Sequence, residues 1–326
     1  SDYSSALIIV MMEWAIVIGT YIVWCIATDH LKRSNPNSLP SWPVKIFFIP
    51  VRAFLRFIGI TQRNEFSAKF DSKRQYMICC APHGAYAFSG ILFVGPQLRL
   101  GLSPELKNHP VFYGVASVLF YVPLIREIVL FIGCREVTQD NVSKIVKNKF
   151  SVAMIPGGIY EQVQTRHDQE RCYVMKKLGF IRLAIQLGVD IVPMYGFGEN
   201  QLFTIHSFGQ AFRLALLKKL RVGLPLVSGR FGLVPHAIEI VHVYGRPIKV
   251  DEACAKPTDA QVEEVYKKYV AEFTRLFKDH ATRLLPKEVA AKGLEVVRVG
   301  VDFDDRADFP SSSSKSLPSG VSKKVQ

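Results

Sequence analysis

Hydrophobic residues open this chain in one nearly unbroken run. Residues 6–27 carry a single charge, Glu13. At about 1.5 Å per helical residue this run is long enough to cross the roughly 30 Å hydrocarbon core of a bilayer. It lacks the basic start and the small-residue cleavage site that are typical of a secretory signal peptide. The pattern predicts a membrane anchor, and a buried core helix is the alternative.

A second apolar stretch, residues 41–60, is interrupted by Lys45, Arg52 and Arg56 and by two prolines. This mixture is typical of an amphipathic helix in the membrane interface, and a hairpin with both ends in the cytosol is the alternative. The basic residues that follow the first run place this side of the membrane in the cytosol by the positive-inside rule. We therefore expect residues 1–65 to form the anchoring region.

From residue 75 the pattern changes to short apolar strands that alternate with amphipathic helices. The predicted strands are residues 75–81, 111–114, 151–155, 190–197 and 238–244, and the predicted helices are residues 139–148, 178–187, 210–221 and 259–284. Thr138 is expected to cap one helix, and Thr258 with Gln261 forms a capping box for another. This alternation favours an α/β domain over residues 66–290, with a mixed, largely parallel sheet flanked by helices.

The charge and the cysteines narrow the function classes. A net charge of +13 favours polyanionic partners, and the 49% of hydrophobic residues point to a membrane or a phosphate-rich ligand. Nucleic acid is not expected, because no aromatic RNA-binding signature accompanies the basic residues. The six cysteines have no metal-ligand spacing and include the adjacent pair Cys79-Cys80, which favours free thiols in a reducing compartment.

The C-terminal extension, residues 291–326, is expected to be disordered from about residue 311, where serine and lysine dominate. It contains Lys323-Lys324, which fits either a dilysine retrieval address of the endoplasmic reticulum or a chance pair.

One histidine stands where a site is expected. His83 follows the strand 75–81 directly, between Pro82 and Gly84. Strand ends in open α/β sheets collect functional residues, and a neutral imidazole is suited to accept a hydroxyl proton. A structural histidine is the alternative, and so is a nucleophile supplied by one of the two preceding cysteines.

Two further strand ends carry polar groups. Gly157 and Gly158 expose backbone N–H groups that are candidates for binding an oxyanion or a phosphate. Glu161 lies one turn further on, where its carboxylate is expected to orient an imidazole. Glu199 and Asn200 follow the strand 190–197. An ordinary turn with a surface glutamate is the alternative at the glycine pair. No Walker lysine, nucleophile elbow or dinucleotide fingerprint is found.

Six segments in this order resemble the type-2 diacylglycerol acyltransferase family, which includes monoacylglycerol and wax-alcohol acyltransferases. They are Pro82-His83-Gly84, the VPLIRE run 122–127, Pro156-Gly157-Gly158-x-x-Glu161, residues 178–184, residues 192–200 and residues 229–235. The resemblance covers residues 75–280. It implies that His83 is the catalytic histidine and that Glu161 is the glutamate of the family's glycine-glycine motif. The chain departs from the family's His-Pro-His-Gly pattern, because Ala81 replaces the first histidine.

The resemblance implies an enzyme that moves an acyl group from acyl-CoA to a lipid hydroxyl, most simply from diacylglycerol to triacylglycerol. Monoacylglycerol, a sterol or a fatty alcohol are alternative acceptors, and a non-catalytic acyl-CoA- or lipid-binding relative is the alternative class. A lysophosphatidate-type reaction is not expected, because Phe88 occupies the place of that group's aspartate. No resident cofactor or metal is expected, and acyl-CoA is the co-substrate.

Arginine side chains in three of these segments are candidates for binding the CoA phosphates, because guanidinium matches phosphate geometry. They are Arg126, which is followed by Glu127, together with Arg182 and Arg230. A structural ion pair is the alternative for each. The expected location is the endoplasmic reticulum membrane, with the catalytic domain in the cytosol and access to lipid droplets. Homo-oligomerisation is left open.

Overall fold

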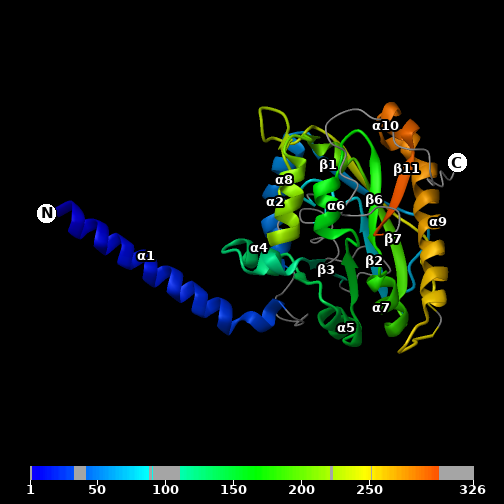
Figure 1. The fold of residues 1–326 in the computed structure, drawn as a ribbon, viewed down its shortest axis with the longest axis horizontal. Helices are drawn as coiled ribbons and strands as arrows, with labels where there is room; N and C mark the ends of the chain where they lie inside the picture. The colour runs from blue at the N-terminus through cyan, green and yellow to red at the C-terminus, as the bar shows by residue number, and fades with distance from the viewer. Residues whose placement is uncertain are drawn as a thin grey trace.

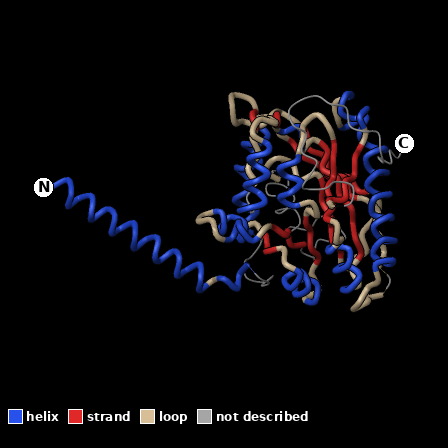
Figure 2. Tube along the Cα trace, viewed as in Figure 1, coloured by secondary structure: helices blue, strands red, loops and turns tan. Residues whose placement is uncertain are grey.

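The computed structural model shows a long helix that projects from an α/β body (Figure 1). The structure describes residues 2–32, 42–87, 90, 111–220, 223–250 and 252–300. The projecting helix is α1 (Asp2–Ala27). The tube view shows strands in the middle of the body and helices on both sides of them (Figure 2).

Seven strands form the central sheet, in the order β1-β10-β7-β2-β5-β3-β4. They are β1 (Thr61–Phe66), β2 (Tyr76–Ala81), β3 (Val111–Val115), β4 (Cys134–Glu136), β5 (Ser151–Met154), β7 (Asp190–Phe197) and β10 (Glu239–Tyr244). All neighbouring pairs are parallel except β10 with β7. This sheet confirms the predicted α/β class.

Two smaller sheets extend the body. β6 (Glu170–Met175) pairs in parallel with β11 (Leu294–Val299), and β8 (Thr204–Ile205) pairs antiparallel with β9 (Val227–Ser228). The sequence pattern missed β1, β4, β6, β8, β9 and β11. Their residues alternate less sharply because each strand lies at a sheet edge or in a two-stranded pair, and several of their side chains keep partial exposure. β1 thus begins inside the expected anchoring region, and β11 lies inside the expected extension.

The two faces of the central sheet pack against different helices. Alternation in β2 points Cys79 towards the face covered by α9 (Asp259–Leu284), and Cys80 towards the face covered by α2 (Trp42–Phe57). The remaining helices are α4 (Ile125–Phe131), α5 (Gln139–Lys147), α6 (Gly158–Gln164), α7 (Gly179–Leu187), α8 (Gln210–Leu220) and α10 (Lys287–Lys292). Short 3-10 turns cover residues 29–32, 117–120 and 200–202.

Both predicted helix caps are present. The Thr138 side chain accepts a hydrogen bond from the N–H of Asn141 at the start of α5. Thr258 and Gln261 form the complete capping box at the start of α9. The predicted strands 75–81, 111–114, 151–155 and 190–197 also appear within one residue of their expected ends. Residues 301–326, and with them the tail expected to be disordered, lie outside the described residues.

Helix α1, the predicted anchor, is joined to the body at its C-terminal end. Within the described residues, Leu7–Ala27 is the one helical segment that is long and apolar enough to cross a bilayer, and none of it is buried. Tyr21 donates a hydrogen bond to the carboxylate of Glu127 (2.6 Å), and Arg126 donates to both oxygens of Thr28. The N-terminal segment is therefore compatible with membrane anchoring, and α4 lies beside its end.

Candidate functional site

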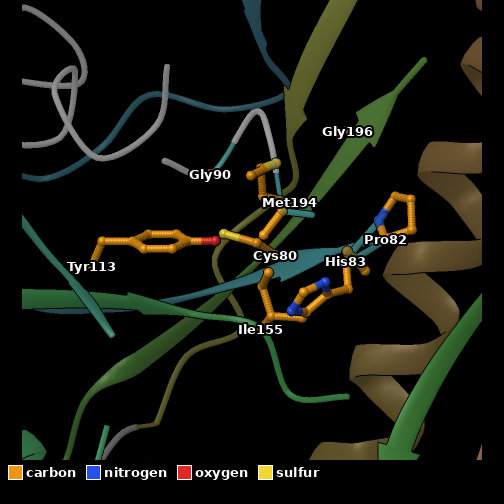
Figure 3. A pocket seen from close by; sticks show the side chains of 10 residues that line it. Cys80, Pro82, His83, Gly90, Tyr113, Ile155, Met194 and Gly196 are labelled. Carbon is orange, nitrogen blue, oxygen red and sulfur yellow. The ribbon is translucent and has the colours of Figure 1, made fainter. Parts of the chain in front are cut away.

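A small pocket opens where four parallel strands end. Side chains from the ends of β2, β3, β5 and β7 point into it, among them His83, Tyr113, Ile155 and Met194 (Figure 3). Its empty space is about 240 Å³, counting the open mouth. Most of this figure is the open mouth and the gaps between atoms, and the enclosed space is about that of one water molecule, so the pocket has room for a reacting group and not for an entire lipid.

The loop after β2 passes very close to the loop after β7. The Ala81–Pro82 peptide bond is cis, and Gly84 has φ of +65°, in the left-handed region. A Cβ at Gly84 would lie 2.6 Å from the carboxyl end of Glu199. Both the conformation and the lack of space therefore require glycine after His83.

The geometry of His83 leaves one ring nitrogen for chemistry. Its Nδ1 lies 3.1 Å from the carbonyl oxygen of Gly84. A carbonyl oxygen can only accept, so Nδ1 carries the proton and Nε2 keeps a free lone pair. Although part of the residue remains accessible through the pocket, its surroundings desolvate the ring and lower the pKa of His83 to about 4. The imidazole is therefore neutral, as a proton acceptor must be.

Glu161 holds the backbone of this loop. One carboxylate oxygen accepts a hydrogen bond from the N–H of His83 (2.8 Å), and the other lies 3.5 Å from the N–H of Tyr173. The residue is 1% exposed, and burial raises the pKa of Glu161 to about 8. Among the contacts that the structure describes, Glu161 binds the backbone of His83. We expected the carboxyl group of Glu161 to orient the imidazole ring. It binds the backbone N–H instead, because α6 brings Glu161 in behind the loop.

The glycine pair 157–158 makes room for the side chain of Glu161 and forms the turn before it. A Cβ at Gly157 would lie 2.0 Å from Oε2 of Glu161, so only glycine leaves room for the side chain. The N–H of Gly158 donates to the carbonyl oxygen of Ile155 (3.1 Å). The turn itself therefore uses this donor, and the oxyanion role expected of the glycine pair stays a prediction.

Two more residues of α6 and its end fasten the same loop. Gln162 donates to the carbonyl oxygen of Ala85 (2.7 Å), and the Thr165 hydroxyl lies 3.4 Å from the carbonyl oxygen of Gly84. Together with Glu161 they connect three successive residues of the loop to one helix. Tertiary contacts of this density hold a loop in one conformation. The structure thus joins three of the sequence segments, around residues 83, 161 and 199, into one site.

A family model for diacylglycerol acyltransferases matches residues 7–291. The chain belongs to this family. Diacylglycerol O-acyltransferase 2 of Dictyostelium discoideum is 26% identical over 86% of this chain and 87% of its own length. 2-acylglycerol O-acyltransferase 1 of Mus musculus is 29% identical over 80% of each chain. Diacylglycerol O-acyltransferase 1 of Eremothecium gossypii is 30% identical over 72% of this chain, which spans about half of that relative's length. The family expected from the motifs is confirmed.

The three arginines of the family segments have protein partners. Arg126 is 2% exposed and binds Glu127 and Thr28 at the joint between α4 and α1. Arg182 binds the carbonyl of Pro257 (2.7 Å) and the carboxylate of Asp259 (2.6 Å) at the start of α9.

Arg230 donates to the carbonyl oxygens of Pro235 and of Ile58, which follows α2. The structure thus assigns all three guanidinium groups to connections between elements, and the expected CoA-phosphate role has no support from their geometry.

A buried carboxylate network lies behind the pocket, and the sequence pattern missed it. Glu170, on β6, is 1% exposed and accepts hydrogen bonds from Tyr195 (2.6 Å), Asn200 (2.7 Å) and Gln201 (2.7 Å). Burial raises the pKa of Glu170. The network fixes the turn after β7, and with it Glu199. Asn200 therefore acts from behind the pocket, and Glu170 gave no signal because the sequence pattern predicted no element around it.

Other residues of the pocket bear on the alternatives. Cys80 lines it, but burial raises the pKa of this thiol far above neutrality, and the thiolate needed by a hydrolase nucleophile is disfavoured. Cys79 points to the opposite face. Tyr113, which the sequence placed only in a strand, turns its hydroxyl towards Cys80 (Figure 3). Burial raises the pKa of Tyr113, so this phenol stays protonated and can donate.

Proposed function

We propose that this protein is an acyl-CoA-dependent O-acyltransferase that acts on a neutral lipid hydroxyl, with diacylglycerol as acceptor and triacylglycerol as product. One observation supports it above the others. His83 is a neutral imidazole whose Nδ1 is bound to Gly84, in a pocket where Nε2 is left for the substrate. Family membership of residues 7–291 supports the reaction class.

The proposed reaction is direct transfer. Nε2 of His83 takes the proton of the acceptor hydroxyl while the oxygen attacks the thioester carbonyl of acyl-CoA. A C–O bond forms, the C–S bond breaks, and the CoA thiolate leaves and recovers the proton from the imidazolium. Positioned base catalysis of this kind contributes about 10²–10⁴-fold. No resident cofactor takes part.

Two other residues support this chemistry from different places. Glu161 is a positioning residue, because its carboxyl group accepts a hydrogen bond from the N–H of His83 and thereby sets the approach of the ring. The Tyr113 hydroxyl is the proposed donor to the oxyanion that develops on the thioester carbonyl. Its position across the pocket from His83 supports this role (Figure 3).

The substrates suggest the location. Acyl chains and a diacylglycerol acceptor both reside in a bilayer, and the apolar helix Leu7–Ala27 is suited to keep the site there. We propose the endoplasmic reticulum membrane, with the α/β body on the cytosolic side and access to lipid droplets, because basic residues concentrate after α1.

The experiment that tests this function is an acceptor panel. The full-length protein, reconstituted in nanodiscs, receives acyl-CoA with a labelled acyl group and one acceptor at a time: diacylglycerol, monoacylglycerol, a fatty alcohol, a sterol or none. We expect labelled triacylglycerol as the main product, and its loss in His83→Ala. Tight binding of acyl-CoA without turnover on any acceptor would overturn the proposal, and release of free fatty acid alone would indicate a hydrolase.

A further inference from the structure

The loop between β9 and β10 ends in a bare apolar tip. Phe231 is 98% exposed and Leu233 is 79% exposed, although they flank a short turn. Phe231 has φ of +51°, in the left-handed region, where a bulky residue costs about 1–2 kcal/mol and asparagine or glycine fits better. Neither the packing nor the conformation of the isolated molecule accounts for a phenylalanine here.

This tip is held rigidly. The N–H of Gly229 donates to the carbonyl oxygen of Gly232 (2.7 Å), and that of Val234 donates to Arg230 (3.0 Å). The Arg230 guanidinium then binds the carbonyl oxygens of Pro235 and Ile58. The tip is therefore braced against the end of α2, and its two large side chains project from a fixed base.

Helix α2 continues the apolar surface away from the tip. It exposes Phe47, Phe54 and Phe57, the last of them to 87%. The ring of Phe47 packs edge-on against Phe131 of α4, with ring centroids 5.4 Å apart, and α4 exposes Ile128. We define the docking surface by six residues that share this exposure: Phe47, Phe54, Phe57, Ile128, Phe231 and Leu233.

Charge separates this surface from the rest of the molecule. No aspartate or glutamate occurs between Asp29 and Glu65 or between Glu199 and Glu239, although the chain has 28 acidic residues. These two stretches contain α2, α8 and the tip, and all their charged side chains are basic. Helix α9, on the opposite face of the sheet, mixes acidic with basic residues along its length. An anionic surface is the partner that such a basic and apolar face fits.

The anchor helix brings this surface to a bilayer. Thr28, one residue beyond the span Leu7–Ala27, binds Arg126 of α4, so α4 lies at the level where the span ends. The ring contact between Phe47 of α2 and Phe131 of α4 places α2 beside α4, near the same plane. Helix α1 also projects from the side of the body that carries α2, α4 and α8 (Figure 1).

We propose that the docking surface lies on the anionic leaflet from which α1 emerges, with Phe231 and Leu233 inserted among the lipids as a wedge. The body is thereby held by two contacts, the span at one end of α2 and the wedge at the other. Two contacts fix the orientation of the sheet against the bilayer, whereas the span alone holds the body at one point.

Photo-crosslinking tests this proposal without relying on catalysis. The full-length protein carries p-benzoylphenylalanine in place of Phe231 and is reconstituted in phosphatidylcholine nanodiscs that contain a tritiated phospholipid. The matched control places the same group at Met175, an exposed apolar residue at the end of β6. We expect about tenfold more labelled protein from position 231, and a further rise of about twofold when phosphatidylserine is added.

Equal labelling at positions 231 and 175 would overturn the proposal, and so would crosslinking in microsomes to protein instead of lipid. The double variant Phe231→Ser/Leu233→Ser should keep its melting temperature and should lower labelling from a probe at position 57 about threefold. Unchanged labelling from position 57 would refute the wedge. His83→Ala should crosslink like the unmodified enzyme, so the outcome is independent of the proposed reaction.

Discussion

The segments that carry the family pattern fall into two groups, which differ in where they lie and in what they contact. Those around residues 83, 161 and 199 converge on one loop, where Glu161 binds the backbone of His83 and Glu199 packs against Gly84. The arginine-bearing segments lie apart and connect elements: α4 to α1, α7 to α9, and the apolar tip to α2. Membership of one pattern therefore does not mean a shared role, and the two groups should respond differently to substitution.

The largest difference is expected at His83. His83→Ala removes the proposed base and should lower kcat about 10²–10⁴-fold while leaving the melting temperature nearly unchanged, because the ring lies at the edge of a pocket. Single-turnover rates with labelled acyl-CoA measure it. Substantial residual transfer would remove His83 from the base role.

Tyr113→Phe isolates the proposed oxyanion donor. The change deletes one hydroxyl and keeps the ring on β3, so we expect kcat to fall about 10²-fold with little change in KM. The matched control is Tyr76→Phe, on β2 at the far end from the pocket. A rise in KM with kcat unchanged would show that Tyr113 shapes the pocket instead of stabilising the transition state.

Glu161 should show a positioning effect that depends on the substituent. Glu161→Ala leaves the buried N–H of His83 without its acceptor, a loss of about 1–3 kcal/mol, and should lower kcat about 10–100-fold. Glu161→Gln keeps one acceptor oxygen and should cost less. In the His83→Ala background neither change should lower the residual rate further, and an additive loss would show that Glu161 acts independently of His83.

The pH profile tests the environment of the base. Burial lowers the pKa of His83 from 6.5 to about 4, so the imidazole remains neutral at mildly acidic pH. The acid limb of kcat/KM for acyl-CoA should therefore lie near pH 4–5, well below an exposed histidine. The unfolded chain binds this proton at higher pH, so stability also falls as the pH drops below about 6.5. Initial rates after brief exposure separate the two effects, and an acid limb near pH 6.5 would contradict the desolvated ring.

The smallest effect is expected among the connecting arginines. Arg182→Met breaks the contacts with Pro257 and with Asp259, which is almost fully exposed, and an ion pair of this kind contributes about 0–1 kcal/mol. We expect a slightly lower melting temperature, with kcat and the KM for acyl-CoA unchanged within about twofold. Lys144→Met, in another exposed ion pair, is the control. A tenfold rise in the KM for acyl-CoA in Arg182→Met, but not in Lys144→Met, would support the CoA-phosphate role and contradict the division into two groups.

Local sequence patterns predicted most of the central elements. β2, and β7 after its first residue Asp190, are apolar because both faces of a parallel sheet are covered, and the caps at Thr138 and Thr258 act within four residues. β1, with the sequence TQRNEF, gave no such signal, because an edge strand needs no apolar face. Its place is determined by pairing with β10, which lies 178 residues later at Thr61↔Glu239.

The sequence alone therefore determined the α/β class, the apolar N-terminal helix, the family and the position of His83 at a strand end, since each rests on periodicity or on a short ordered motif. The tertiary structure decided what touches His83. Glu161 lies 78 residues away and binds the backbone of His83, and Tyr113 enters the pocket from β3. The N–H of Gly158 donates to the carbonyl oxygen of Ile155 within its own turn. Spacing along a chain does not specify which atom of a residue a distant side chain reaches, because that depends on how the strands are ordered and where each one ends.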